Sequence, residues 1–301
     1  MPELPEVEVA RRNLEKWLRR QKLTKVELSP RVFEGNAPAF AQKLVAHTVQ
    51  EVERRGKWLR LQFDHELVLF SHLGMTGKWV LRKHDDPPQP YERARLDNAR
   101  RSVRYVDPRL FGTLVGASGD TAPNAWRALG PDALVDGVDA AQLQAKLAKR
   151  RKTIKETLLD QTVLAGVGNI QAAEALWRAK IHPERAADSL TKAEVAALAD
   201  GVAGSIRDTL AREDGPEITY VEEAGAENPF DVYGKQGQAC PRCGTTLVRI
   251  VQGGRSTVYC PKCQRLKAAK AADGKTRVAR VKAVPKSRVP RMKGLPKSRK
   301  A

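Results

Sequence analysis

The sequence predicts an α+β protein with an opening helix, a β-rich N-terminal region, a helical middle region and a small β-hairpin near the C-terminus. Three observations predict it. The apolar spacing changes from strand-like to helical near residue 130, four cysteines form two close pairs, and a strongly basic tail follows them. At 301 residues and 41% hydrophobic content, the chain is long enough for buried cores and for more than one domain.

The N-terminal region, residues 1–130, is expected to be a helix followed by strands. Pro5 suits the first turn of the helix, because proline lacks an N–H that this turn leaves unpaired. Four apolar residues fall on one helix face: Leu4, Val7, Leu14 and Leu18. Three later segments have strand composition: 57–63, 67–70 and 103–106.

From residue 131 to about 225 the pattern is helical. Leu143 and Leu147 share one face of a helix, as do Ile154 and Leu158. Segments 170–179 and 192–210 are predicted to be further helices.

The cysteines predict a metal site in residues 226–264. All four stand in C-x2-C pairs separated by sixteen residues: Cys240, Cys243, Cys260 and Cys263. This spacing is typical of a tetrahedral, structural Zn²⁺ site. Two disulfides are the alternative, which a reducing cytosol disfavours. Segments 246–251 and 256–259 are predicted to form a hairpin with its turn at 252–255, so that Arg255 lies at the tip.

The charge is concentrated at the C-terminus. The net charge is +19, and residues 265–301 hold 14 Lys and Arg against one acid, Asp273, which is +13 and leaves +6 for the rest. We expect 265–301 to be a disordered basic arm, with a merely solubilising tail as the alternative. The balance favours a polyanionic partner, most often nucleic acid and less often an anionic membrane surface. No apolar run is long enough to cross a membrane and the N-terminus lacks a secretory pattern, so a cytoplasmic location is expected.

The first residues suggest covalent chemistry. Removal of Met1 would leave the secondary amine of Pro2 at the start of a helix, where the helix dipole disfavours a positive charge. A neutral secondary amine can attack an aldehyde-level carbon, and Glu3 and Glu6 are adjacent candidates for acid or base. An ordinary proline-capped helix would show the same residues.

Six motifs together carry a resemblance to the formamidopyrimidine-DNA glycosylases. They span residues 1–264 in order: Met-Pro-Glu-Leu-Pro-Glu-Val at 1–7, Arg-Gly-Lys-Trp-Leu at 55–59, His-Leu-Gly-Met-Thr-Gly at 72–77, Asp-Pro-Arg-Leu-Phe-Gly at 107–112, Gly-Val-Gly-Asn-Ile at 166–170 and Gly-Arg-Ser-Thr-Val-Tyr-Cys at 254–260. The resemblance implies a β-sandwich (1–130), a helix–two-turn–helix domain (131–225) and a zinc finger (226–264). It also implies a monomer that binds damaged double-stranded DNA between its domains, in the cytoplasm at the nucleoid and without contact with a membrane.

The resemblance also assigns roles. Pro2 would be the nucleophile at C1′, and Glu3 the acid that assists sugar ring opening and base departure. Lys57 would be a phosphate ligand and an acid in β-elimination, and Arg255 a phosphate ligand that assists δ-elimination. Met75, Arg109 and Phe111 would fill the space that a flipped nucleotide vacates. Further DNA contacts would come from Glu6, Arg151, Lys155 and Asn169. The side chain of Asn169 is expected to cap a helix whose free N–H groups face a phosphate.

Several positions depart from the family pattern. Gln171 replaces a usual tyrosine, Leu110 replaces an arginine and Glu156 replaces a frequent proline. The family's lesion-enclosing loop cannot be found in 212–224, so the preference for 8-oxoguanine and formamidopyrimidines over oxidised pyrimidines is open. An endonuclease VIII-like enzyme and a lesion-binding protein without catalysis remain as alternatives.

Overall fold

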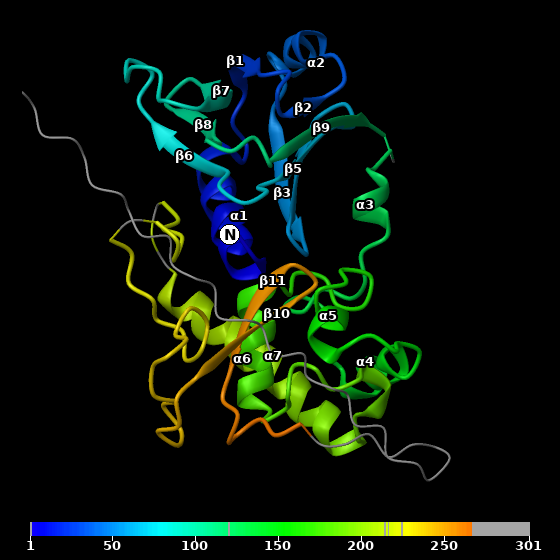
Figure 1. Ribbon diagram of the computed structural model, residues 1–301. Coiled ribbons are helices and arrows are strands. Elements are labelled where there is room, and N and C mark those ends of the chain that lie inside the picture. Colours follow the sequence, from blue (N-terminus) through cyan, green and yellow to red (C-terminus); the bar gives the residue numbers. More distant parts are fainter. Residues whose placement is uncertain (1, 120, 214, 216, 224, 267–301) are drawn as a thin grey trace, which may run out of the picture. The chain divides into compact units, whose positions relative to one another are not determined.

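The computed structural model describes residues 2–119, 121–213, 215, 217–223 and 225–266 (Figure 1). Residues up to Lys267 form one compact unit, in which three hydrophobic cores are distinct. The predicted basic arm lies outside the described residues, except for residues 265 and 266. No helix of the described residues is both long and apolar enough to cross a membrane.

Helix α1 (Leu4–Leu18) opens the chain, as predicted. Pro5 lies in its first turn, and the Glu6 carboxylate accepts a hydrogen bond from the Glu3 N–H at 2.8 Å, which closes the helix N-terminus. The four predicted apolar residues of its inner face are all fully buried.

Two sheets of mostly antiparallel strands follow and form a β-sandwich. One has the strand order β1-β7-β8-β6, and the other has the order β2-β9-β5-β4-β3. Their bounds are β1 Leu23–Leu28, β2 Phe33–Glu34, β3 Val49–Arg55, β4 Trp58–Phe63, β5 Leu67–His72, β6 Lys78–Arg82, β7 Glu92–Asn98, β8 Ser102–Val106 and β9 Thr113–Ser118, with helix α2 (Ala37–Leu44) between β2 and β3. Leu61 of one sheet and Leu96 and Val103 of the other share the first core. The predicted strand at 57–63 alternates between buried and partly exposed residues, whereas 67–70 and 103–106 are buried on both faces along most of their length.

The middle region is helical, as predicted (Figure 1). Its elements are α3 (Asn124–Arg127), α4 (Ala140–Leu147), α5 (Ile154–Leu158), α6 (Asn169–Arg178), a 3₁₀ turn (Ala187–Ser189) and α7 (Lys192–Arg212). The predicted helix faces, Leu143 with Leu147 and Ile154 with Leu158, meet in the second core. Leu4 of α1 belongs to that core too, so the first turn of the chain is packed against the helical region.

Strands β10 (Val248–Gln252) and β11 (Arg255–Tyr259) form the predicted hairpin. Its turn is shorter than expected, because Gln252 pairs directly with Arg255 and only Gly253 and Gly254 lie between them. Both glycines have positive φ (53° and 74°), the conformation that a two-residue hairpin turn requires. Arg255 therefore begins a strand, directly after the tip.

Candidate active site and nucleic-acid interface

The N-terminal residues lie directly on the start of α6. The Leu4 N–H donates to the Gly166 carbonyl at 3.1 Å. A Cβ on Gly168 would come within 2.3 Å of the Glu3 side chain, so only glycine admits this approach. The buried Glu3 carboxylate accepts three N–H groups at the helix start: from Gly168 at 3.0 Å, Ile170 at 2.7 Å and Gln171 at 3.0 Å.

The expected capping by Asn169 is wrong. The N-cap residue is Gly168, and the N–H groups predicted to face a phosphate bind the Glu3 carboxylate instead. The physical reason is that α1 brings a carboxylate, the group that a helix N-terminus favours, to within hydrogen-bond distance. The N-terminal motif therefore supplies the Glu3 carboxylate, and the motif at 166–170 supplies two of the N–H groups that bind it.

Glu3, Glu6 and Arg255 all lie within electrostatic reach of Lys57. Burial, and then the charge of Glu3, raises the pKa of Glu6 to about 7. Burial also lowers the pKa of Lys57, with Arg255 acting in the same direction and Glu3 and Glu6 opposing it. The structure therefore gathers four residues predicted to be functional, from α1, the β3–β4 turn and the zinc hairpin, around one point. Pro2, the fifth, is buried next to Glu3.

The raised pKa of Glu6 predicts a pH effect on stability. The folded protein binds this proton more tightly than the unfolded chain, so the contribution is fully present below pH 4.5 and is lost as pH rises through 7. Ionised Glu6 should then cost about 3 kcal/mol of unfolding free energy. Urea denaturation should find Glu6→Gln as stable as the parent protein near pH 4.5 and more stable by about that amount above pH 8. A stability difference that does not change with pH would contradict this explanation.

The side chain of Lys155 connects α5 to α6 and to β11. Its ammonium donates to Asn169 Oδ1 at 2.8 Å and to Thr257 Oγ1 at 3.1 Å, and Asn169 Nδ2 donates to the Ser256 carbonyl at 3.0 Å. Lys155 is only 1% exposed, and burial lowers its pKa to about 8. It is therefore not a solvated helix charge but a buried contact that attaches β11 to α5 and α6. No sequence motif indicates that Thr257 takes part in this contact.

The four cysteines meet the requirements of a zinc site. Each offers a sulfur atom within 4.8 Å of the others, and Cys243 and Cys260 have sulfurs 3.5 Å apart. Tetrahedral Zn²⁺ with Zn–S bonds of ~2.3 Å separates its sulfurs by about 3.8 Å, so the cluster fits a single ion. No position is left for water, and the protein therefore has one structural Zn²⁺.

Two loops at one end of the β-sandwich carry the predicted wedge residues. The buried Asp107 carboxylate accepts from Thr76 Oγ1 at 2.7 Å in one loop and from the Gly112 N–H at 2.8 Å in the other. Phe111 is 52% exposed, and the Arg109 guanidinium lies 4.9 Å from its ring centre. Met75, in the Thr76 loop, is half-buried. An exposed phenylalanine on a clamped loop suits insertion into a base stack more than core packing.

The departures from the family pattern are accommodated locally. Gln171 is fully buried and bridges α6 to α7, since it accepts from Ser205 Oγ at 2.6 Å and donates to Thr209 Oγ1 at 3.1 Å. Leu110 stands between the wedge residues with a positive φ of 58° and is 38% exposed. Glu156 accepts from Thr153 Oγ1 at 2.7 Å in the first turn of α5.

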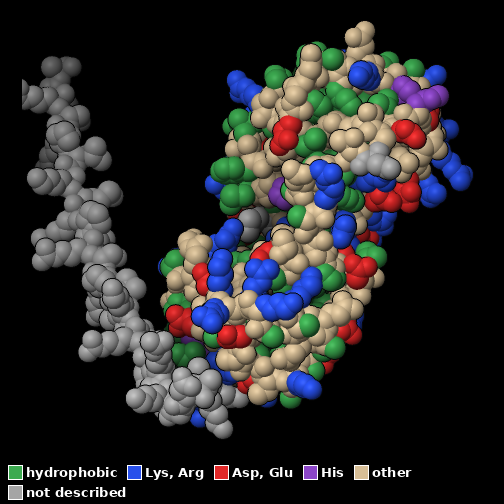
Figure 2. Space-filling model, turned by 90° about the vertical axis from the view of Figure 1, so that its right-hand side faces the viewer, with side chains coloured by type: hydrophobic (Ala, Val, Ile, Leu, Met, Phe, Trp, Pro, Cys, Tyr) green, Lys and Arg blue, Asp and Glu red, His purple; other side chains and the backbone are tan. Residues whose placement is uncertain are grey.

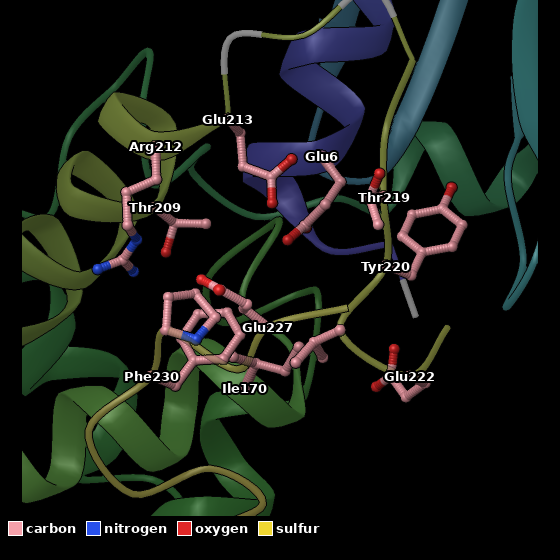
Figure 3. A pocket seen from close by; sticks show the side chains of 12 residues that line it. Glu6, Ile170, Thr209, Arg212, Glu213, Thr219, Tyr220, Glu222, Glu227 and Phe230 are labelled. Atoms are coloured by element: carbon pink, nitrogen blue, oxygen red, sulfur yellow. The ribbon is translucent and has the colours of Figure 1, made fainter. Parts of the chain in front are cut away.

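A small pocket of about 60 Å³, partly open to solvent, adjoins this site. Figure 3 shows the Glu6, Glu213 and Glu227 carboxylates directed toward its interior. The rest of the lining is part apolar and part polar: Ile170, Tyr220, Val221, Pro229 and Phe230, with Thr209, Arg212, Thr219 and Glu222. The Tyr220 hydroxyl donates to the Gly77 carbonyl at 2.6 Å, so the segment after α7 closes over the β-sandwich.

The remaining predicted basic residues are on the surface. Arg151, just before α5, and Arg255 are both exposed. Figure 2 shows Lys and Arg side chains gathered near the middle of one face, the kind of distribution that attracts a polyanion.

Comparison with known families covers most of the chain. The formamidopyrimidine-DNA glycosylase N-terminal domain matches residues 1–114, the H2TH domain of the same family matches 129–219, and the zinc finger found in FPG and IleRS matches 237–266. The formamidopyrimidine-DNA glycosylase of Laribacter hongkongensis is 41% identical over 278 residues, which are 88% of this chain and 100% of the relative. That of Herpetosiphon aurantiacus is 40% identical over 275 residues, with the same coverage.

Solved structures of DNA complexes are similar over the same extent. The Lactococcus lactis Fpg (MutM) with DNA that contains N7-benzyl-Fapy-dG superposes with a TM-score of 0.81 at 34% identity, covering 88% of this chain and 100% of that one. The L. lactis enzyme with abasic-site DNA gives a TM-score of 0.80 at 35% identity, with the same coverage. This chain belongs to the formamidopyrimidine-DNA glycosylase family, the zinc-finger DNA glycosylases of base excision repair.

Proposed function

We propose that the protein is a bifunctional DNA glycosylase and abasic-site lyase that removes an oxidised base and cuts the strand by β,δ-elimination. The nitrogen of Pro2 forms a bond to C1′ of the damaged nucleotide, and the electron pair of the glycosidic bond leaves with the protonated base. Glu3 assists by protonating the sugar ring oxygen as the ring opens to an iminium ion. The observation that carries the proposal is the convergence of Glu3, Glu6, Lys57 and Arg255 around the N-terminus.

The iminium then drives strand cleavage. Loss of a C2′ proton expels the 3′ phosphate, and loss of the C4′ proton expels the 5′ phosphate. Lys57, with its lowered pKa, is suited to transfer a proton in the first elimination. Arg255, exposed beside the hairpin tip, is suited to hold a phosphate through the second.

The DNA contacts follow from the same positions. Phe111 and Met75 enter the stack and Arg109 binds the orphaned partner base, at the unstacking cost of a few kcal/mol that flipping requires. Glu6 faces the flipped nucleotide, and Arg151 contacts the backbone. Lys155 and Asn169 support the interface from below, because their side chains are bound to each other and to the hairpin.

The pocket favours guanine-derived lesions over oxidised pyrimidines. Four carboxyl groups line the pocket, those of Glu6, Glu213, Glu222 and Glu227, against the one guanidinium of Arg212, so carboxyl groups predominate there. 8-Oxoguanine and formamidopyrimidine-guanine both present an N–H and an exocyclic amine on their pairing edge, whereas thymine glycol presents there one N–H between two carbonyl acceptors and carries its two hydroxyl groups on the opposite side of the ring. The flipped base is thus better matched when it is a purine derivative, even without the family's usual enclosing loop.

Borohydride trapping tests the proposal. Incubated with duplexes that contain 8-oxoguanine opposite cytosine, the processed wild-type chain should form a covalent adduct, and Pro2→Gly or a blocked N-terminus should not. A thymine glycol duplex should be trapped more slowly, and faster trapping there would favour the endonuclease VIII-like alternative. Tight lesion binding without product, unchanged in Pro2→Gly, would instead indicate a binding protein without catalysis.

The proposal also covers the oligomeric state, the location in the cell and the basic tail. The enzyme acts as a monomer in the cytoplasm at nucleoid DNA, and residues 265–301 add sequence-independent affinity for phosphates. The domain boundaries at residues 130, 225 and 264 belong to the same proposal.

A further inference from the structure

A second cluster of metal-ligating side chains lies on the N-terminal β-sandwich. His47 precedes β3, while Asp64 and His65 form the turn between β4 and β5. Strands β3 and β4 pair with Val49 opposite Phe63, and the Asp64 N–H donates to the Thr48 carbonyl at 3.1 Å. The pairing therefore brings together three residues from two separate segments.

The ligand atoms of these residues are close and already oriented. One atom each of His47, Asp64 and His65 lies within 4.8 Å of the other two. Asp64 Oδ1 is 2.5 Å from His47 Nδ1, and the other oxygen, Oδ2, accepts from the Thr48 N–H at 3.2 Å. The two imidazole rings are 5.4 Å apart between centres, at 78° to each other. The carboxylate is thus fixed by the backbone and already hydrogen-bonded to His47, and a bound ion would take the place of the proton between Oδ1 and Nδ1.

The turn holds His65 in place. His65 and Glu66 both have positive φ (53° and 60°), and the Leu67 N–H donates to the Asp64 carbonyl at 3.4 Å. This is the conformation of a tight hairpin turn, in which Asn-Gly is the usual sequence. The backbone conformation of the turn therefore places His65 beside His47.

We propose that His47, Asp64 and His65 bind a divalent transition-metal ion, with Zn²⁺ as the probe of choice. Two imidazoles and one carboxylate suit Zn²⁺, Ni²⁺ or Cu²⁺, whereas Mg²⁺ and Ca²⁺ require oxygen ligands. The His47 and Asp64 side chains are 26% and 32% exposed, so the ion can enter from solvent and keep water in its open positions. The site is separate in residues and ligand type from the four-cysteine zinc.

The position limits what this ion can do. Lys57 directly precedes β4, and the proposed site follows its other end. Six residues at ~3.3 Å each place the two roughly 20 Å apart, so the ion does not touch the reacting nucleotide. It instead links the beginning of β3 to the β4–β5 turn and stabilises that edge of the sandwich.

Zinc uptake by the full chain with its cysteine site filled tests the inference. Equilibrium dialysis against micromolar free Zn²⁺, followed by metal analysis, should give two ions per chain for wild type and one for His65→Asn or Asp64→Asn. Asn is chosen at 65 because it tolerates positive φ and keeps the turn. The matched control is His84→Asn, a histidine of the same domain that binds the Asn98 carbonyl and should leave the count at two.

Thermal unfolding gives an independent measurement. Added Zn²⁺ should raise the melting temperature of wild type and of His84→Asn, but not of His65→Asn, because only a bound ion stabilises the folded state. One ion per chain in wild type would overturn the inference. So would equal uptake by wild type and both ligand variants, which would show that the second ion binds elsewhere. Excision should be unchanged by His65→Asn, so failure of this inference leaves the proposed function unaffected.

Discussion

Replacing Glu3 by glutamine is expected to lower the rate of base excision by about 10²–10⁴-fold, the usual contribution of a positioned acid or base. Cleavage at a preformed abasic site should fall much less, because no base has to depart and the abasic sugar is already in equilibrium with its open-chain aldehyde. The reason lies in the surroundings of Glu3, which is fully buried and accepts three N–H groups from the start of α6. Glutamine keeps the size but removes the acid and directs an NH₂ group at N–H donors.

Part of the lost activity in Glu3→Gln would come from lower stability of the folded protein, and a control variant separates this cause from the loss of the acid. Unsatisfied N–H groups at the helix start should reduce the free energy of unfolding by about 1–3 kcal/mol. The matched control is Glu15→Gln, on the same helix, whose carboxylate also accepts a backbone N–H, from Val52 at 3.0 Å. Single-turnover rates on 8-oxoguanine and abasic duplexes, measured well below the unfolding temperature, should show loss of excision in Glu3→Gln alone. Equal loss of both reactions would mean that Glu3 only holds the N-terminus in place.

The periodic parts of the fold were predictable from the sequence. The inner face of α1, the paired leucines of α4 and the strands around Leu61 are determined by burial, and burial leaves a pattern in the order of residues. The zinc site was predictable for a different reason, since four thiolates at fixed spacing have few other uses in a reducing compartment.

Contacts between distant segments were not predictable in the same way. The Glu3 carboxylate occupies the start of α6, 165 residues further along the chain, and nothing in either motif specifies that the other is its partner. Thr257 binds Lys155 across 102 positions, and Asp107 clamps two loops that each look self-contained in sequence. Such polar contacts have no period, because each depends on a single pair of groups meeting after the cores have formed.

The pocket beside Glu6 could not be predicted from the sequence either. The absence of the family's usual loop in 212–224 left the base specificity open. The structure supplies the lining from Glu6 and from separate points between Thr209 and Phe230, some of them beyond the segment in which the loop was sought. Pocket chemistry was therefore accessible only once the segment after α7 was placed against α1 and α6.

Loss of the structural zinc is expected to reduce strand cleavage and base excision by on the order of 10²-fold or more, the typical effect of misplacing a positioned group. A two-stranded hairpin is marginal by itself, and the third core contains only a few side chains beside the cysteines. Without the metal, β11 should detach, which removes Arg255 from the site and Thr257 from the buried Lys155. The first two cores should remain folded.

Cys263→Ser provides the measurement, since Cys263 is only partly buried and serine leaves its packing nearly unchanged. The variant should contain no zinc at the cysteine site, keep most of its circular dichroism and lose activity on both 8-oxoguanine and abasic duplexes. Arg255→Ala should lose mainly the second elimination, while Arg249→Ala, on the same hairpin, should behave as wild type. A zinc-free variant with wild-type rates would show that the metal does not position the hairpin. The ordering of these three variants follows from the hairpin itself, in which Arg255 and Thr257 belong to β11 and Arg249 belongs to β10.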